Sequence, residues 1–305
     1  MKLLILLVLL LVGCGSFEVS HEAQFKADLS PIQVSEGSSA DSGDLLPYRV
    51  FNGSGVVSVA SWNLQVFGAS KAADEEFMGV VKSLLEGVYD AVFLLEVRDA
   101  NLASDSSWNK FCNMFAQSGY SCYLSSRAGT TISKEAVGLV YKEPLTIVNI
   151  TDYNLVPGYP GLFERPPLLV EFKANNYSLK FLVSHIKPDH AVGEIEELYK
   201  LAGTIPGNVV VMGDLNADCD YYSCSSNDNF DDWWWGIPNK GDTTVSDNNL
   251  CAYDRVIVNQ DAFAESMGAS VWRERITEEV SDHYLVLYAF IPEEKGVRSK
   301  GLVYC

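Results

Sequence analysis

An apolar run that ends in oxygen-bearing side chains is the feature that most constrains this chain. Residues 209–213 read Val-Val-Val-Met-Gly, and Asp214, Asn216 and Asp218 follow directly. A β-branched apolar run predicts a buried strand, and the glycine marks its end. Taken alone, the polar residues also fit a turn built from Asp and Asn. At the mouth of a central strand, however, they can bind a divalent cation or orient a water molecule, whereas an apolar interior would exclude them.

Four further segments combine an apolar strand with polar side chains at one end. A single histidine in such a position is more often structural than catalytic. Several histidines, asparagines and acids at strand ends are difficult to explain as independent accidents, so we predict a functional site there. The segments are 56–62 followed by Asn63, 89–95 followed by Glu96, 179–184 followed by His185, and 284–288 preceded by Ser281, Asp282 and His283.

The order of these residues resembles the endonuclease/exonuclease/phosphatase superfamily and, within it, the deoxyribonuclease I-like enzymes. The resemblance extends from about residue 55 to residue 292. A single Gly-Asp-x-Asn motif is moderately specific, whereas the complete ordered set is strongly specific. The closest matching segments are Asn-Leu-Gln-Val-Phe-Gly at 63–68, Glu-Val-Arg-Asp at 96–99, residues 213–219, and Cys-Ala-Tyr-Asp-Arg at 251–255.

The length of the chain and the alternation of strands and helices fit one large α/β domain. The chain has 305 residues and no internal repeat of fixed period. Helices are expected at 74–85 and 191–201, each with acidic residues near its start, where they suit the helix dipole. The resemblance implies a four-layer α/β sandwich, in which two packed mixed β-sheets are flanked by helices.

The resemblance also implies hydrolysis of DNA phosphodiester bonds that leaves 5′-phosphate and 3′-hydroxyl ends. In this interpretation His283 is the general base on the attacking water, and Asp214 or Asp254 orients it. His185 assists the leaving 3′-oxygen, with Glu135 as its orienting partner. An unperturbed imidazole titrates near pH ~6.5, which suits proton transfer around neutrality.

A metal-dependent reaction requires oxygen ligands for a hard cation. The resemblance assigns Glu96, Asn63 and Asp282 to Mg²⁺, or to Mn²⁺ in its place, and assigns to Asn216 an amide that donates to the phosphate. Such cations favour oxygen ligands and retain several waters. A second oxygen-rich loop, 242–249, corresponds to a structural Ca²⁺ loop of the family. Its candidate ligands are Asp242 and Asp247, and a plain solvated loop is the alternative.

The net charge of −18 argues against indiscriminate binding of nucleic acid. The family nevertheless binds DNA through a few local arginines, and Arg98, Arg165 and Arg255 lie in or beside matching segments. Ordinary surface arginine is the alternative for each of them. Two family contacts are altered, because Ser133 replaces a tyrosine and Gln65 replaces an arginine. The resemblance therefore implies an intact catalytic core with weaker DNA binding or an altered cleavage preference.

The N-terminus has the features of an export signal. Residues 1–12 are apolar apart from Lys2 and are too few to span a bilayer, so 1–13 are predicted to be a signal peptide. Leu-Val-Gly-Cys at 11–14 resembles the lipobox of prokaryotic lipoproteins, which makes Cys14 a lipidated anchor to the membrane. Ordinary secretory cleavage is the alternative. Further along, we expect a tether at 14–54, a catalytic domain at 55–292 and a tail at 293–305.

Cysteine usage fits an exported chain, because six cysteines remain when Cys14 is set aside. The resemblance implies a disulfide between Cys219 and Cys251. Cys112 and Cys122 are close enough in sequence to pair, which leaves Cys224 for Cys305. A metal–thiolate site is the competing interpretation, but the sequence has no Cys-x-x-Cys spacing.

The function that the sequence favours is that of an exported, monomeric deoxyribonuclease that acts on DNA. A sphingomyelinase of the same superfamily is the strongest rival enzyme, because a lipid anchor would place it at a membrane. It would need an exposed, long apolar hairpin, which the sequence lacks. A catalytically inactive surface-binding protein is the other alternative. It is disfavoured because all the core acids, histidines and asparagines of the resemblance are present.

Overall fold

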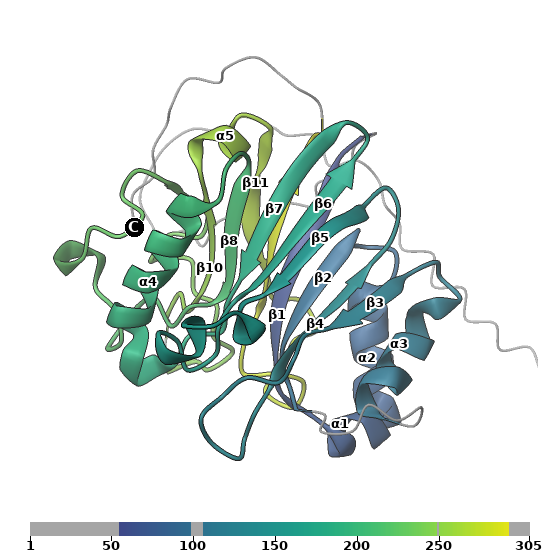
Figure 1. The fold of residues 1–305 in the computed structure, drawn as a ribbon. Helices are drawn as coiled ribbons and strands as arrows, with labels where there is room; N and C mark the ends of the chain where they lie inside the picture. Colours follow the sequence, from purple (N-terminus) through teal and green to yellow (C-terminus); the bar gives the residue numbers. More distant parts are fainter. Residues whose placement is uncertain (1–54, 99–105, 249, 293–305) are drawn as a thin grey trace, which may run out of the picture. The chain divides into compact units, whose positions relative to one another are not determined.

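Two β-sheets packed face to face form the centre of the structure (Figure 1). The computed structural model describes residues 55–98, 106–248 and 250–292. The first sheet has the order β11-β12-β1-β2-β4-β3, and only its β1–β2 pair is parallel. Its strands are β1 (Val57–Phe67), β2 (Ala91–Val97), β3 (Ser121–Leu124), β4 (Ala136–Tyr141), β11 (Ser266–Trp272) and β12 (Leu285–Phe290).

The second sheet repeats this plan, with one parallel pair, β7–β8, among antiparallel neighbours. Its strand order is β5-β6-β7-β8-β10-β9. The apolar run at 209–213 lies at the centre of this sheet and is fully buried, as the sequence predicts. The strands are β5 (Thr146–Asp152), β6 (Leu168–Ala174), β7 (Tyr177–Val183), β8 (Val209–Asp214), β9 (Trp234–Trp235) and β10 (Asp254–Val258).

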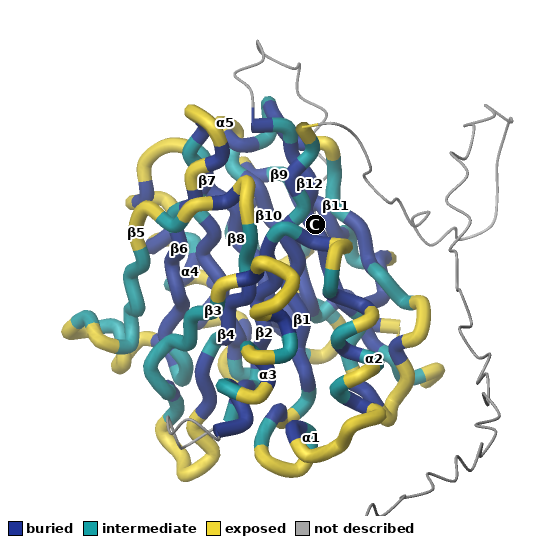
Figure 2. The backbone as a smooth tube through the Cα atoms, turned by 90° about the vertical axis from the view of Figure 1, so that its right-hand side faces the viewer, coloured by how far each residue is buried: buried dark blue, intermediate teal, exposed yellow. Residues whose placement is uncertain are grey.

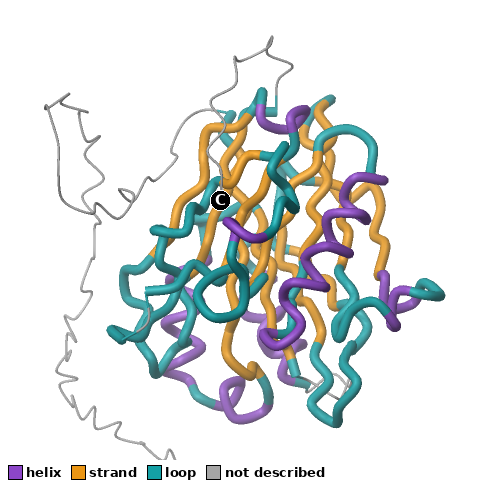
Figure 3. Tube along the Cα trace, turned by 90° about the vertical axis from the view of Figure 1, so that its left-hand side faces the viewer, coloured by secondary structure: helices purple, strands orange, loops and turns teal. Residues whose placement is uncertain are grey.

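Helices cover the outer face of each sheet, which completes four layers. One buried cluster fills the space between the sheets, and two others join each sheet to its helices. Figure 2 shows α1 to α3 over the first sheet, and Figure 3 shows α4 over the second. The helices are α1 (Ala69–Ala73), α2 (Glu75–Leu85), α3 (Ser107–Ala116), α4 (Ala191–Thr204) and α5 (Gln260–Phe263); 3₁₀ turns are η1 (Tyr153–Leu155), η2 (Tyr159–Gly161), η3 (Pro188–His190) and η4 (Cys224–Ser226).

The predicted four-layer sandwich is therefore confirmed, as are the two predicted helices. Helix α2 begins where the side chain of Asp74 accepts hydrogen bonds from the backbone nitrogens of Glu76 and Phe77. Such a cap satisfies amide groups that have no partner within the helix. Helix α4 begins at Ala191 as expected but continues to Thr204, three residues beyond the predicted end.

The structure contains the predicted disulfides Cys112–Cys122 and Cys219–Cys251, whose Cα atoms are 6.0 and 5.9 Å apart. The second bond joins the loop after β8 to the residues before β10, and it therefore braces the edge of the sheet that carries Asp214. Cys305 lies outside the described residues, so its pairing with Cys224 stays a prediction.

Replacing both Cys219 and Cys251 with serine is expected to lower the free energy of unfolding by about 4 kcal/mol. The bond closes a loop with a sequence separation of 32, and it restricts the unfolded chain accordingly. Removing Cys112–Cys122, with a separation of 10, is expected to cost about 3 kcal/mol. Urea denaturation of both double variants measures the difference. A larger loss for the shorter loop would contradict this ranking.

Cys14 and the segments predicted as signal peptide, tether and tail also lie outside the described residues. Among residues 55–98, 106–248 and 250–292, no helix has both the length and the apolar character needed to cross a bilayer.

Candidate active site

The polar residues predicted at strand ends meet at one edge of the two sheets. Asn63 lies near the end of β1, and Glu96 near the end of the parallel strand β2. In the second sheet Asp214 ends β8 and lies directly opposite Asp254, which begins the antiparallel strand β10. His185 follows β7 by two residues. Both sheets therefore supply groups to a single site.

Gly213 allows the ends of β7 and β8 to approach closely. Its φ is +133°, in a region that side chains strongly disfavour. A Cβ atom at this position would lie 2.1 Å from the backbone oxygen of Ser184, on the segment that leads to His185. The glycine that ends the apolar run therefore also brings His185 and Asp214 together.

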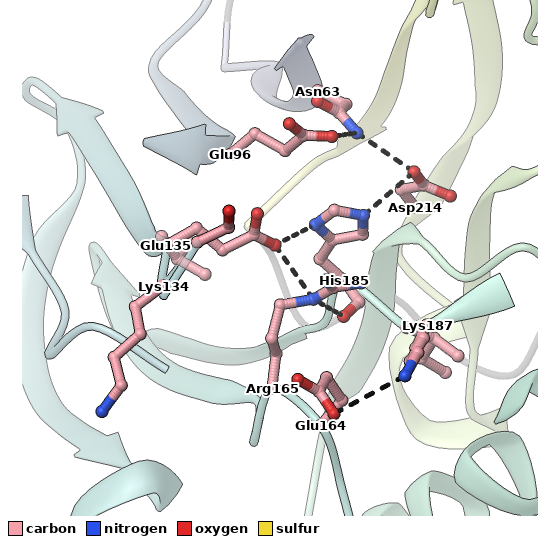
Figure 4. Close-up of polar contacts among 12 residues, drawn as sticks. Asn63, Glu96, Lys134, Glu135, Glu164, Arg165, His185, Lys187 and Asp214 are labelled. Carbon is pink, nitrogen blue, oxygen red and sulfur yellow. Dashed lines mark hydrogen bonds and ion pairs between the residues drawn. The ribbon is translucent and has the colours of Figure 1, made fainter. Parts of the chain in front are cut away.

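The first catalytic candidate is a histidine held by a buried glutamate. The Nδ1 atom of His185 lies 2.5 Å from Glu135 Oε1, so its Nε2 atom is left facing the site (Figure 4). Arg165 fixes the same pair, because its Nε donates to the backbone oxygen of His185 at 2.8 Å and lies 2.9 Å from Glu135 Oε1. Burial alone would raise the pKa of Glu135, but His185 and Arg165 outweigh it and keep that pKa below its ordinary value.

The second candidate has the same construction. His283 Nδ1 lies 2.7 Å from Asp254 Oδ2, and its Nε2 faces the site. Burial alone would lower the pKa of His283, but the carboxylates of Asp254 and Asp214 outweigh it and raise the pKa to about 10. Asp254 is fully buried, and burial raises the pKa of this carboxyl above its ordinary value. The neighbouring carboxylates therefore favour the protonated form of His283.

Asp214 lies between the two histidines. Its Oδ2 atom is 3.5 Å from His185 Nε2 and 3.6 Å from His283 Nε2. Although burial opposes its ionisation, the two imidazoles hold the pKa of Asp214 below its ordinary value. The sequence predicts Asp214 or Asp254 as the partner of His283. The geometry gives the Nδ1 contact to Asp254 and makes Asp214 a shared neighbour of both rings.

Asn63 connects the acids of the two sheets through its side-chain amide. Its Oδ1 accepts a hydrogen bond from the backbone nitrogen of Gln65 at 2.9 Å, while its Nδ2 donates to Glu96 Oε1 and Asp214 Oδ2 at 3.2 and 3.1 Å. The backbone donor fixes the orientation of the amide. Asn63 therefore positions two carboxylates with its nitrogen, while its role as an oxygen ligand of the metal stays a prediction.

Two clusters of acidic and histidine side chains could hold a divalent cation, and the predicted ligand Glu96 belongs to one of them. Ligand atoms of Glu96, Glu135 and His185 lie within 4.8 Å of one another, as do those of Asp214, Asp254 and His283. Asp254 Oδ1 is buried without a hydrogen bond from any described residue, which is unfavourable unless another group compensates. Carboxylate oxygens are the ligands that Mg²⁺ and Mn²⁺ favour. Glu96 and Asp214 are the residues we expect to hold the cation.

Two predicted residues lie at the margin of the site. Asp282 is half-exposed, and its Oδ1 is 3.9 Å from His283 Nε2. It belongs to neither of the two clusters of acids and histidine described above. Asn216 donates from Nδ2 to the backbone oxygen of Ile186 at 2.9 Å, and this contact holds its amide nitrogen in place. Its φ of +48° is uncommon for a residue other than glycine, as is the +57° of Glu96.

Comparison with known proteins identifies the family of this chain. Residues 60–283 match the family model of the endonuclease/exonuclease/phosphatase family. The chain belongs to this family. It is 30% identical to deoxyribonuclease-1-like 2 of Mus musculus over 226 residues, which cover 68% of this chain and 78% of the relative. It is 29% identical to human deoxyribonuclease gamma over 282 residues, which cover 80% and 89%. The chain is thus a deoxyribonuclease I-like member of the family.

Solved structures support the same fold for this family member. D. rerio TDP2 complexed with a single-strand DNA product has a TM-score of 0.56 at 14% identity, covering 77% of this chain and 98% of that one. The catalytic domain of human Nocturnin with a bound sulfate anion has a TM-score of 0.54 at 13% identity, covering 78% and 93%. At such low identity these likenesses bear on the fold alone.

The structure corrects one predicted DNA contact of this family member. Arg255 is fully buried, and its guanidinium donates to the backbone oxygens of Ile237 and Ala217 and to Asn239 Oδ1 at 2.6–2.7 Å. A phosphate cannot reach it. Arg255, on β10, joins the loop after β8 to the loop after β9, which is a structural role. By contrast, Arg98 and Arg165 both lie beside Glu135 in the site.

The proposed calcium loop stays a prediction. Asp242 Oδ1 accepts hydrogen bonds from the backbone nitrogen and hydroxyl of Thr244 at 3.0 and 2.8 Å, so one of its oxygens already organises the loop. Asp247 is exposed. Among the described residues, neither aspartate belongs to a cluster of three or more acidic, histidine or cysteine side chains that could hold a metal ion.

Three residues to which the sequence assigns no separate role join β1 to the loop that carries His283. Trp62 Nε1 donates to the backbone oxygen of His283 at 2.9 Å, and the Ser281 hydroxyl donates to that of Asn63 at 2.6 Å. Lys71 Nζ donates to the backbone oxygens of Leu64 and Val280 at 2.7 and 2.9 Å. Trp62 and Ser281 adjoin matching motifs, which is a usable signal, whereas nothing in the sequence marks Lys71.

Proposed function

We propose that this protein is an exported, monomeric, metal-dependent endodeoxyribonuclease that leaves 5′-phosphate and 3′-hydroxyl ends. The observation that carries the proposal is the pair of histidines. Each has its Nδ1 atom on a buried carboxylate and its Nε2 atom directed toward Asp214. Two imidazoles held in this way suit a displacement at phosphorus, which needs a proton removed on one side and delivered on the other. The deoxyribonuclease relatives support DNA as the substrate.

The chain's own residues divide the reaction between them. Asp254 holds His283 so that Nε2 can take a proton from an attacking water, and Glu135 holds His185 so that Nε2 can give one to the departing oxygen. Asn63 keeps the carboxylates of Glu96 and Asp214 in place. A bound Mg²⁺ would neutralise the phosphate, and its charge would lower the raised pKa of His283, which would free Nε2 to accept a proton.

The location that we propose for the enzyme rests on the sequence. The apolar start and the Leu-Val-Gly-Cys segment support export and a lipid anchor on Cys14. The Cys112–Cys122 and Cys219–Cys251 disulfides support an oxidising compartment. We therefore propose that the enzyme acts outside the cytoplasm, held at the membrane or released, on DNA that it meets there.

The proposal is tested with the purified protein and supercoiled plasmid. We expect nicking in Mg²⁺ or Mn²⁺, and a loss of at least about a hundredfold in EDTA, because a bound metal supplies several kcal/mol of charge stabilisation. DNA ligase should reseal the nicks, since it joins only a 5′-phosphate to a 3′-hydroxyl. Unsealable nicks would contradict the proposed products.

Parallel assays separate the alternatives. Sphingomyelin vesicles offered under the same metal conditions should stay intact. Hydrolysis of sphingomyelin with intact plasmid would make the protein a sphingomyelinase. Metal-independent binding of DNA without cleavage would make it a surface-binding protein.

A further inference from the structure

Arg98 occupies a position between two acids of the site that the proposed mechanism does not explain. Its Nη2 atom lies 3.0 Å from Glu96 Oε2, and its Nε atom lies 3.7 Å from Glu135 Oε2. About a third of the Arg98 side chain is exposed, whereas Glu135 is almost completely buried. The guanidinium therefore lies at the mouth of the site, with the two carboxylates behind it.

A positive charge is needed at this point. Oxygens of Glu96 and Glu135 and a ring nitrogen of His185 lie within 4.8 Å of one another. Two carboxylates this close, one of them buried, repel each other unless a cation compensates. Arg165 compensates Glu135 from the other side, where a hydrogen bond to the backbone oxygen of His185 holds it. Among the described residues, Arg98 is the arginine that contacts Glu96.

The contacts of the two arginines differ in a way that bears on movement. Arg165 is bound both to a carboxylate and to a backbone oxygen, so it is fixed. The Arg98 side chain instead contacts the carboxylates of Glu96 and Glu135, which are the kind of group that a divalent cation would bind. A cation on Glu96 would therefore compete directly with the Arg98 guanidinium.

We propose that Arg98 is an internal counterion that a divalent cation displaces from Glu96, and that the displaced guanidinium then binds the phosphate backbone of DNA. This inference rests on the proposed function only in its second half. The released side chain stays at the mouth of the site, where a strongly anionic strand would meet it. A bound cation then raises the affinity for DNA, and bound DNA raises the affinity for the cation. The two affinities must rise by the same factor.

The first test measures cation binding without DNA. Isothermal titration calorimetry with Mg²⁺ and with Mn²⁺ should show that Arg98→Met binds each cation about threefold to tenfold more tightly than wild type, because the competitor is gone. Arg98→Lys retains a competing charge and should stay close to wild type. Unchanged or weaker cation binding by Arg98→Met, in a variant that keeps the wild-type unfolding temperature, would overturn the proposal.

A matched control removes the effect of net charge. Lys173 is exposed on β6, eight residues from Arg165, and strand geometry places it roughly 25 Å from the site. Lys173→Met changes the net charge by the same amount and should leave the cation affinity unchanged. An equal gain in cation affinity in both variants would show a general electrostatic effect and would contradict the role of Arg98 as a counterion.

The second test measures DNA binding in a non-cleaving His283→Ala background. Fluorescence anisotropy with a duplex should show that Mg²⁺ raises the affinity for DNA, and that adding Arg98→Met removes most of this increase. An undiminished increase would refute the second half of the proposal. Absence of DNA binding under every condition would refute the nuclease instead, and the calorimetry would still decide whether Arg98 is displaced.

Discussion

His185→Ala and His283→Ala are each expected to lower the rate of plasmid nicking by about a hundredfold to ten-thousandfold, which is the usual contribution of one general acid or base. Each substitution removes the ring nitrogen that its carboxylate partner holds toward the site. Because the two imidazoles serve one displacement, the double variant should be scarcely slower than the worse single variant. Initial nicking rates at saturating Mg²⁺ measure all three.

His190 provides the control for these substitutions. It is a more exposed histidine at the start of α4, and its nearest carboxylate is Glu194, with Nδ1 3.6 Å from Oε1. His190→Ala should keep nearly the full rate of nicking. A similar loss in all three single variants would indicate damage to the fold, and full activity in His185→Ala or His283→Ala would refute the two-histidine mechanism.

Arg255→Met is expected to lower the free energy of unfolding by about 3–5 kcal/mol, the usual cost of breaking a buried charged network. The substitution leaves the backbone oxygens of Ala217 and Ile237 without the donors that now reach them at 2.6 and 2.7 Å. It also removes a guanidinium that lies 5.2 Å from the centre of the Trp235 ring. Urea denaturation with the disulfides intact measures the loss.

The same variant decides whether Arg255 has any role in binding DNA. Below its unfolding transition, Arg255→Met should nick plasmid within a few-fold of the wild-type rate, because the guanidinium is out of reach of substrate. Arg275→Met removes an exposed arginine and should change stability by no more than about 0.5 kcal/mol. Unchanged stability together with weak DNA binding in Arg255→Met would restore the role of Arg255 as a DNA contact.

The sequence predicts the layers of this fold well because its strands are strongly patterned. The run at 209–213 is apolar throughout, which is the pattern of a strand covered on both faces, and β8 is such a strand. The residues at its end are equally informative, because carboxylates are costly to bury and therefore indicate an open edge of the sheet or a bound cation. Gly213 and Asp214 can therefore be placed in the site from the sequence.

Other parts depend on contacts that a linear pattern does not contain. The sequence predicts an oxygen ligand from Asn63, but it does not reveal that the amide nitrogen of Asn63 joins the carboxylates of Glu96 and Asp214. Arg255 lies within a matching motif, and only the packing of the loops after β8 and β9 around it shows that it is buried. Lys71 joins segments far apart in the sequence, and such a bridge has no periodicity or motif to reveal it.

Both sheets contribute residues to the site, and this affects when the protein becomes active as it folds. Glu135, Asn63 and His283 belong to the first sheet or its connections, whereas His185, Asp214 and Asp254 belong to the second. Neither half contains a histidine together with its complete set of partners until the sheets have docked. Activity should therefore appear later during refolding than the β-sheet signal itself. The rate at which nicking activity returns in a refolding sample would therefore measure the rate at which the two sheets dock.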